Sequence, residues 1–152
     1  MMYRYTSSRG FTLLLATLTS ALLLLLGATI FGLIKKEIIL SSLGRDSQFA
    51  FYAADTASEC ALYWDLRHNI FATTTPYSGA TCDLQSLGTI QFPGYGVATT
   101  FEYEPNGYCA RASITKSLTF PRTVIYARGY NTTCAGIVNN PRTLERAVEL
   151  TY

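Results

Sequence analysis

The feature that most constrains this chain is an uncharged apolar run of 24 residues from Phe11 to Ile34. At 1.5 Å per residue, a helix of this length measures about 36 Å, enough to cross a hydrocarbon core of about 30 Å with some tilt. A secretory signal peptide has a shorter apolar region that ends at a small-residue cleavage site. This run instead continues directly into Lys35 and Lys36. We therefore predict a membrane-spanning helix over residues 11–34.

The residues that flank this run predict its orientation. The segment before it carries Arg4 and Arg9 and no acidic residue. Positively charged flanks of a membrane helix stay on the cytoplasmic side. The N-terminus is therefore expected in the cytoplasm, on the inner side of a single-pass membrane protein. Everything after Ile34 is expected on the outer side.

Four cysteines follow the apolar run, and no two are close enough for a C-x-x-C zinc or redox motif: Cys60, Cys82, Cys109 and Cys134. An even number of widely spaced cysteines in an exported domain indicates two disulfides. The sequence permits three pairings. We favour Cys60–Cys82 with Cys109–Cys134, because each closes a local loop of about 20–25 residues. Buried free thiols are the alternative.

The helical pattern continues beyond the apolar run. From Lys35 to about His68 there is no proline, and apolar residues and alanines recur at spacings of three and four. We predict one helix from Phe11 to His68, in which residues 35–68 are an amphipathic extension that packs on the domain. The predicted apolar positions are Leu40, Leu43, Phe51, Ala54, Ala57, Ala61, Leu62 and Trp64.

Residues 69–152 read as a strand-rich domain braced by disulfides. After a loop rich in turn-forming residues, alternating patterns occupy 95–104, 108–116, 122–128 and 144–152. The last of these also suits the start of a short helix. The expected fold is α+β, with the long N-terminal helix packed on an antiparallel sheet of about four strands.

Charge and residue inventory narrow the function classes. Without Arg4 and Arg9, ten basic residues balance ten acidic ones, and no basic cluster stands out. A protein that binds the nucleic-acid backbone needs several basic residues on one face. His68 is the single histidine and no serine or cysteine stands in a nucleophile motif, so a catalytic triad cannot be built from the usual parts. We expect no catalytic residues, no metal and no cofactor.

Eleven tyrosines leave two interpretations open. Alternate tyrosines in strands pack a sheet, which we favour. Exposed tyrosines also serve adhesion or stacking on single-stranded nucleic acid.

A specific motif precedes the apolar run. The segment Arg9-Gly10-Phe11-Thr12-Leu13, after a short basic leader, resembles the processing site of type IV prepilins. In that family a membrane-embedded prepilin peptidase cuts after the glycine, and the new N-terminal residue is N-methylated. The resemblance implies a leader peptide over residues 1–10, a cut between Gly10 and Phe11, and methylation of Phe11.

One position departs from the family pattern. Most major pilins carry a glutamate at the fifth mature position, where this chain has Leu15. A carboxylate in lipid costs about 2.5–3.5 kcal/mol on insertion scales, so major pilins retain it for a partner, the N-terminal amine of a neighbouring subunit. Minor pilins and pseudopilins placed at a filament tip lack it. The resemblance is therefore to a minor pilin or pseudopilin, and the alternative is a chain that stays anchored without assembling.

The expected function is that of a structural subunit of a type IV pilus or related filament in a bacterial cell envelope. Its partners are expected to be prepilin peptidase, membrane lipid before assembly and other pilin subunits through the N-terminal helix. Ala28 and Gly32 form a small-x-x-x-small pair that permits close helix contact, although such pairs also arise by chance. The rivals are a tip-located binding module for DNA or a surface ligand, and a membrane-anchored enzyme.

Overall fold

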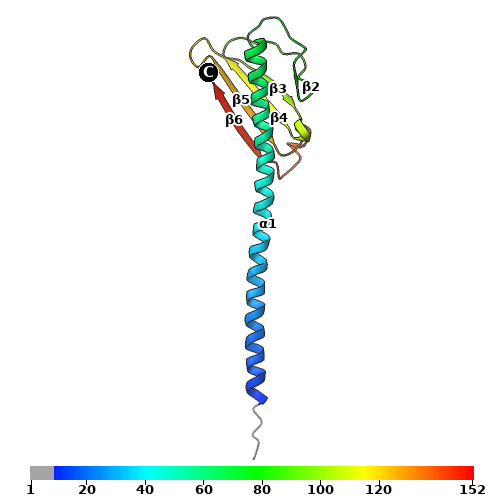
Figure 1. Cartoon of the computed structure of the whole chain (residues 1–152), viewed down its shortest axis with the longest axis vertical. Coiled ribbons are helices and arrows are strands. Elements are labelled where there is room, and N and C mark those ends of the chain that lie inside the picture. Colours follow the sequence, from blue (N-terminus) through cyan, green and yellow to red (C-terminus); the bar gives the residue numbers. More distant parts are fainter. Residues whose placement is uncertain (1–8) are drawn as a thin grey trace, which may run out of the picture. The chain divides into compact units, whose positions relative to one another are not determined.

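The computed structural model describes the backbone of residues 9–152 and the side chains from Phe11 onward (Figure 1). The predicted leader peptide, residues 1–10, therefore lies outside the described residues except for the backbone of Arg9 and Gly10. The described chain comprises two compact units, one that ends at Ser42 and one that spans Leu43–Tyr152.

A single helix, α1, runs from Arg9 to His68 over 60 residues and confirms the predicted long N-terminal helix. It ends because Asn69 takes the left-handed conformation, with φ of 49°. The Asn69 amide donates to the carbonyl of Asp65 at 3.0 Å, which is how helices commonly close their last turn. Arg67 and His68 lie in that turn, where positive charge suits the helix dipole.

The four predicted strands form one antiparallel sheet with the order β3-β4-β5-β6. Each strand pairs with the next along the chain, so the sheet is a simple meander. The last segment is a strand throughout and does not begin as a helix. The bounds are Ala98–Tyr103 for β3, Ala110–Lys116 for β4, Thr123–Tyr130 for β5 and Glu145–Thr151 for β6. Two short 3-10 helices, η1 at Pro105–Gly107 and η2 at Cys134–Gly136, lie between strands.

The strand ends differ from the predicted ones for local reasons. β3 begins at Ala98 instead of Tyr95, because Gly94 and Gly96 adopt positive φ and hold a turn there. The predicted turn between β3 and β4 is present. Asn106 and Gly107 accept its left-handed conformation, with φ of 53° and 80°.

A small hairpin precedes the sheet and was not predicted. Its strands, β1 at Thr81–Cys82 and β2 at Gln85–Ser86, have two residues each, too few for a periodic pattern. The side chain of Gln85 ties the hairpin to the end of β3, because it donates to the Glu104 carbonyl at 2.9 Å and accepts from the Glu104 amide at 3.0 Å.

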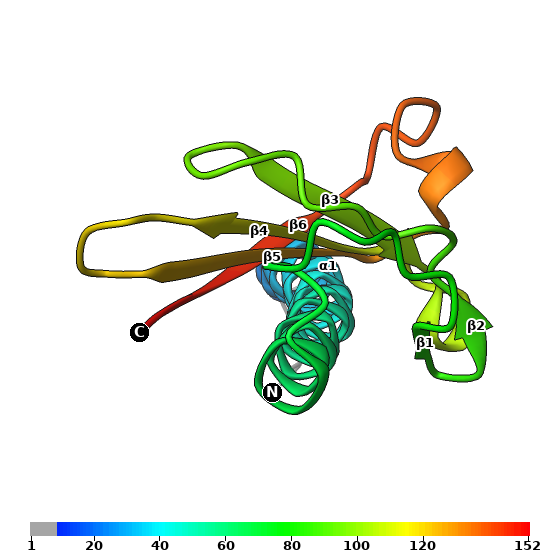
Figure 2. The ribbon, with the colours of Figure 1, turned by 90° about the horizontal axis from the view of Figure 1, so that it is seen from above.

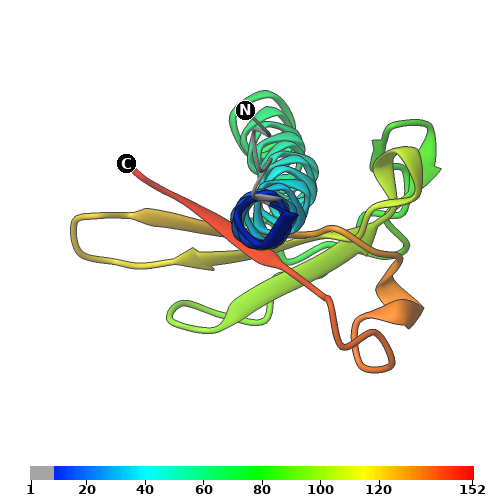
Figure 3. The same cartoon turned by 90° about the horizontal axis from the view of Figure 1, so that it is seen from below.

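Within Leu43–Tyr152, the C-terminal part of α1 covers one face of the four-stranded sheet (Figure 2). In the part of the chain that the structure describes, no α-helix covers the opposite face. Figure 3, seen from below, shows the sheet nearly edge-on, with the β4–β5 hairpin in yellow. The helix face against the sheet is built from small residues, all of them buried: Ala50, Ala53, Ala54, Ala57 and Ala61. A helix with such a narrow face approaches a sheet closely.

Part of the predicted helix face was wrong. Leu40, Leu43 and Phe51 are exposed, the last by 46% of its surface, whereas alanines that flank Phe51 are buried. The alanine side of the helix packs on the sheet, because the backbone of β5 at Gly129 lies so close to α1 that a large side chain would not fit between them.

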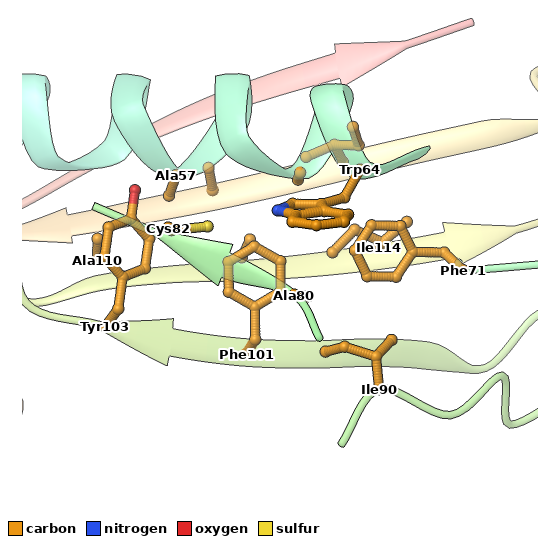
Figure 4. Close-up of a cluster of buried hydrophobic side chains, with 14 of the residues drawn as sticks. Ala57, Trp64, Phe71, Ala80, Cys82, Ile90, Phe101, Tyr103, Ala110 and Ile114 are labelled. Carbon is orange, nitrogen blue, oxygen red and sulfur yellow. The ribbon is translucent and has the colours of Figure 1, made fainter. Parts of the chain in front are cut away.

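The core lies between α1 and the sheet, and Figure 4 shows its side chains. Trp64, the only tryptophan, packs here, and its indole N–H donates to the Thr81 carbonyl at 2.9 Å. Phe71, from the loop after α1, stacks on Phe101 of β3 with ring centroids 6.2 Å apart. Ile114 of β4 and Ile125 of β5 complete the sheet side of the core and are fully buried.

Two disulfides brace this unit, Cys60–Cys82 and Cys109–Cys134. They are the pairing favoured from the loop lengths. The first joins α1 to the β1–β2 hairpin beside Trp64. The second joins the start of β4 to η2, so both irregular segments are held to the helix and sheet.

Candidate functional site

The candidate site is the apolar N-terminal part of α1. Within the described residues, α1 is the one helix long and apolar enough to cross a membrane, with a mean hydropathy of 2.3 in its most apolar 18-residue window. Every residue from Phe11 to Ser42 is exposed. An apolar surface of this extent needs lipid or other helices to cover it.

Hydroxyl groups in this segment are already satisfied by the helix. An unpaired hydroxyl in hydrocarbon costs several kcal/mol, roughly 4–8 on cyclohexane scales. Thr17 donates to the Leu14 carbonyl at 2.9 Å, and Thr29 donates to the Leu26 carbonyl at 2.8 Å. Thr19 and Ser20 bond to preceding carbonyls in the same way. These polar residues therefore do not prevent the segment from lying in lipid.

The predicted processing residues lie at the start of α1. Gly10 and Phe11 are the second and third residues of the helix, and the side chain of Phe11 is 69% exposed. Leu15 follows one turn later and exposes half of its surface. An uncharged side chain at this position gives the helix no group that could pair with a buried amine.

The predicted packing pair also lies on an open helix surface. Ala28 and Gly32 are four residues apart and share one face. A Cβ added at Gly32 would meet no described atom within 4 Å, and the same holds at Gly27. This face has the space that a second helix needs for close backbone approach.

Apolar exposure continues past the charged residues that end the predicted span. Lys35, Lys36 and Glu37 are followed by Ile38, Ile39 and Leu40, which are exposed by 52–70% of their surface. If residues 11–34 fill the hydrocarbon core, the side chains of these three residues lie beyond it.

A buried charged cluster joins the C-terminal end of α1 to the sheet. The sequence patterns did not predict it. Asp65 of α1 is buried, and its Oδ2 accepts from Lys116 Nζ of β4 at 2.5 Å and from the Tyr152 hydroxyl at 2.6 Å. Lys116 Nζ also donates to Thr123 Oγ1 of β5 at 2.9 Å. The only signal in the sequence was an acidic residue directly after the buried Trp64.

This cluster changes the titration of Tyr152. Burial and the hydrogen bond to the Asp65 carboxylate raise the pKa of the Tyr152 phenol well above its usual value of about 10. The unfolded chain therefore releases this proton at a lower pH than the folded chain does. The contribution of Tyr152 to stability is complete below pH 10 and is lost as the pH rises through the folded pKa.

We expect the free energy of unfolding to fall above about pH 10 and to fall less steeply in a Tyr152→Phe variant. Burial also raises the pKa of Tyr103 and of Tyr130, so part of the decline remains in the variant. The measurement is denaturant unfolding at several values of pH, followed by Trp64 fluorescence. Tyr95→Phe, which removes a phenol with no contact to Asp65, is the matched control. Parallel declines for wild type and Tyr152→Phe contradict the prediction.

Cys109, Cys134 and Glu102 lie close together, as a metal site requires, but the two sulfurs form a disulfide and are not free thiolates. No protein-family model matches this chain, and comparisons with curated proteins and with solved structures give no match. The fold and the surface of α1 are therefore the observations on which a function is proposed.

Proposed function

We propose that this chain is the precursor of a minor pilin or pseudopilin, a structural subunit of a type IV pilus or related filament. Prepilin peptidase cuts it after Gly10 and Phe11 is methylated. The apolar part of α1 stays in the cytoplasmic membrane, with the N-terminus inside, until it packs among the helices of other subunits. The disulfide-braced domain faces outward, at the cell surface or on the filament.

The observation that carries this proposal is the helix itself. One uninterrupted helix begins at the predicted cleavage site, presents an exposed apolar surface from Phe11 onward, and ends packed by small residues against an antiparallel sheet. Such a helix gives a subunit both a membrane-resident part and a part that packs on an exported domain.

Assembly is favoured over simple anchoring by the apolar residues beyond the predicted span. An anchor needs apolar side chains only where lipid covers them. Ile38, Ile39 and Leu40 follow three charged residues and remain exposed. Neighbouring helices in a filament would cover them without lipid.

Leu15 supports a position at or near the filament tip. A subunit with no further subunit above it meets no N-terminal amine of a neighbour, so a carboxylate at this position would be buried without a partner. The role of this position is implied by the family resemblance, and the leucine is observed in the sequence.

Determination of the native N-terminus tests the proposal. Intact-mass and N-terminal peptide mass spectrometry on protein isolated from its own cell envelope should find a chain that begins at N-methylated Phe11. A chain that begins at Met1, or that is cut near Gly32, contradicts the proposal. Membrane anchoring without assembly gives a processed chain in the membrane fraction and none in sheared filaments.

Cross-linking tests the packing face of the helix. All four cysteines are in disulfides, so a cysteine introduced in α1 is the single free thiol. We expect Ala28→Cys to cross-link to a neighbouring subunit that carries a thiol at its own packing face. Ile30→Cys lies about 200° around the helix and is the matched control. Equal yields from the two positions indicate random collision in the membrane and contradict the predicted face.

The role of Leu15 has its own test. Leu15→Glu places a carboxylate where major pilins have one. We expect the amount of this chain recovered in sheared filaments to change several-fold, because the new charge needs an amine partner in hydrocarbon. Leu15→Gln, which is polar but uncharged, is the control. Unchanged recovery of Leu15→Glu counts against the tip position.

A further inference from the structure

The face of the sheet that faces away from α1 carries a polar cluster with no role in the proposed function. Alternate residues of β3, β4 and β5 point to this face, and six of them line a shallow depression of about 300 Å³. We call these residues the outer-face site: Thr100, Glu102, Arg111, Ser113, Tyr126 and Arg128.

Two arginines lie opposite each other in the outer-face site. Arg111 of β4 and Arg128 of β5 are register partners, so their Cβ atoms lie about 5 Å apart. Like charges directly opposite each other destabilise a sheet. The guanidinium groups lean over different tyrosines, Arg111 over Tyr130 and Arg128 over Tyr126, at about 6 Å from each ring.

Only one of these two charges has an acidic partner. Arg111 Nε donates to Glu102 Oε2 at 2.7 Å. Arg128 has no ion pair or hydrogen bond of its side chain within the described residues, and its guanidinium lies over the Tyr126 ring. The site therefore presents an unmatched guanidinium whose planar fork suits a carboxylate.

The surroundings of Arg128 add hydrogen-bonding groups and an aromatic surface. The hydroxyls of Thr100 and Ser113 line the depression and have no hydrogen-bond partner in the described part of the chain. Tyr126 exposes 40% of its surface and offers a ring on which the C–H face of a sugar can pack. A volume of about 300 Å³ lies at the small end of ligand sites, which suits one or two sugar units.

Acidic residues of the same face add hydrogen-bond acceptors to those of the hydroxyls. Glu149 lies opposite Tyr126, and Glu145 lies opposite Tyr130 on the edge strand β6. Carboxylates accept hydrogen bonds from sugar hydroxyls, so the same residues favour a saccharide.

We propose that the outer-face site binds a carboxylated sugar, such as a uronic acid unit of an acidic polysaccharide. The sugar carboxylate pairs with the Arg128 guanidinium, the ring packs against Tyr126, and the hydroxyls bond to Ser113, Thr100 and the flanking glutamates. This binding does not depend on cleavage after Gly10 or on filament assembly, so the proposal and the proposed function fail independently.

The test uses the full chain in neutral detergent micelles, titrated calorimetrically with trigalacturonic acid up to about 10 mM. We expect saturable binding, no binding of the fully methyl-esterified trisaccharide, and a loss of about tenfold or more in affinity for Arg128→Gln. Arg142→Gln removes the same charge from an exposed residue of the loop between β5 and β6, which does not line the outer-face site, and should bind as wild type does. Near-UV circular dichroism checks that each variant is folded.

Several results overturn the inference. They are the absence of saturable binding, equal affinity for the acid and its methyl ester, and equal weakening by Arg128→Gln and Arg142→Gln. Tighter binding of a single-stranded oligonucleotide that depends on Arg128 overturns it in favour of a nucleic-acid surface.

Discussion

Replacing Asp65 by alanine is expected to lower the free energy of unfolding by about 3–5 kcal/mol. The substitution leaves Lys116, whose side chain is 12% exposed, with a buried charge and only the hydroxyl of Thr123 as a recorded partner. It also removes the acceptor of the Tyr152 hydroxyl. Denaturant unfolding of the full chain in detergent micelles, followed by the fluorescence of Trp64, measures the loss.

A double substitution separates the effect of an unpaired buried charge on stability from the effect of lost side-chain packing. Asp65→Leu combined with Lys116→Met replaces both charges by apolar groups of similar size, which is often neutral or stabilising in a core. We expect the double variant to be more stable than either single one. If both single substitutions cost less than about 1 kcal/mol, the pair behaves like an exposed ion pair and this view of the cluster is wrong.

Gly129→Ala is expected to destabilise the domain by about 3 kcal/mol, at the upper end of the usual cost of overpacking. A Cβ at this position of β5 would overlap the carbonyl oxygen of Ala50 and the amide nitrogen of Ala54, and would lie 2.9 Å from the carbonyl carbon of Ala53. All three atoms belong to the helix backbone, so no flexible side chain can move aside. The sheet would have to move away from α1.

Gly44→Ala is the matched control for this substitution. Gly44 lies in α1 itself, and a Cβ there meets no described atom within 4 Å. We expect this variant to gain about 0.5–1 kcal/mol, because alanine is the better helix former. Wild-type stability for Gly129→Ala, measured by thermal unfolding in the near-UV, contradicts the close approach of helix and sheet.

Local patterns were sufficient for much of the fold. The apolar run and the spacing of apolar residues after it predicted a single helix to His68, and alternation predicted four strands, because each signal is complete within one segment. Loop length favoured the disulfide pairing that the structure contains. The β1–β2 hairpin was missed, since two-residue strands held by Gln85 leave no periodic signal.

The candidate functional residues also fall into those that local sequence predicted and those that it did not. The predicted processing and packing residues, among them Gly10, Leu15 and Gly32, follow from local sequence, and their roles remain predictions. The outer-face site was not predicted. Arg111 and Arg128 are 17 positions apart in the sequence, and only strand register places them opposite each other.

By itself, the sequence determined that a helix able to span a membrane precedes a strand-rich domain with two disulfides, because hydropathy, periodicity and loop length are local properties. Only the tertiary structure decided which side of α1 meets the sheet. That choice depends on Gly129, whose missing side chain lets β5 approach the backbone at Ala50. Only the tertiary structure placed Asp65 beside Lys116, 51 positions later, since a buried ion pair forms where packing brings the charges together.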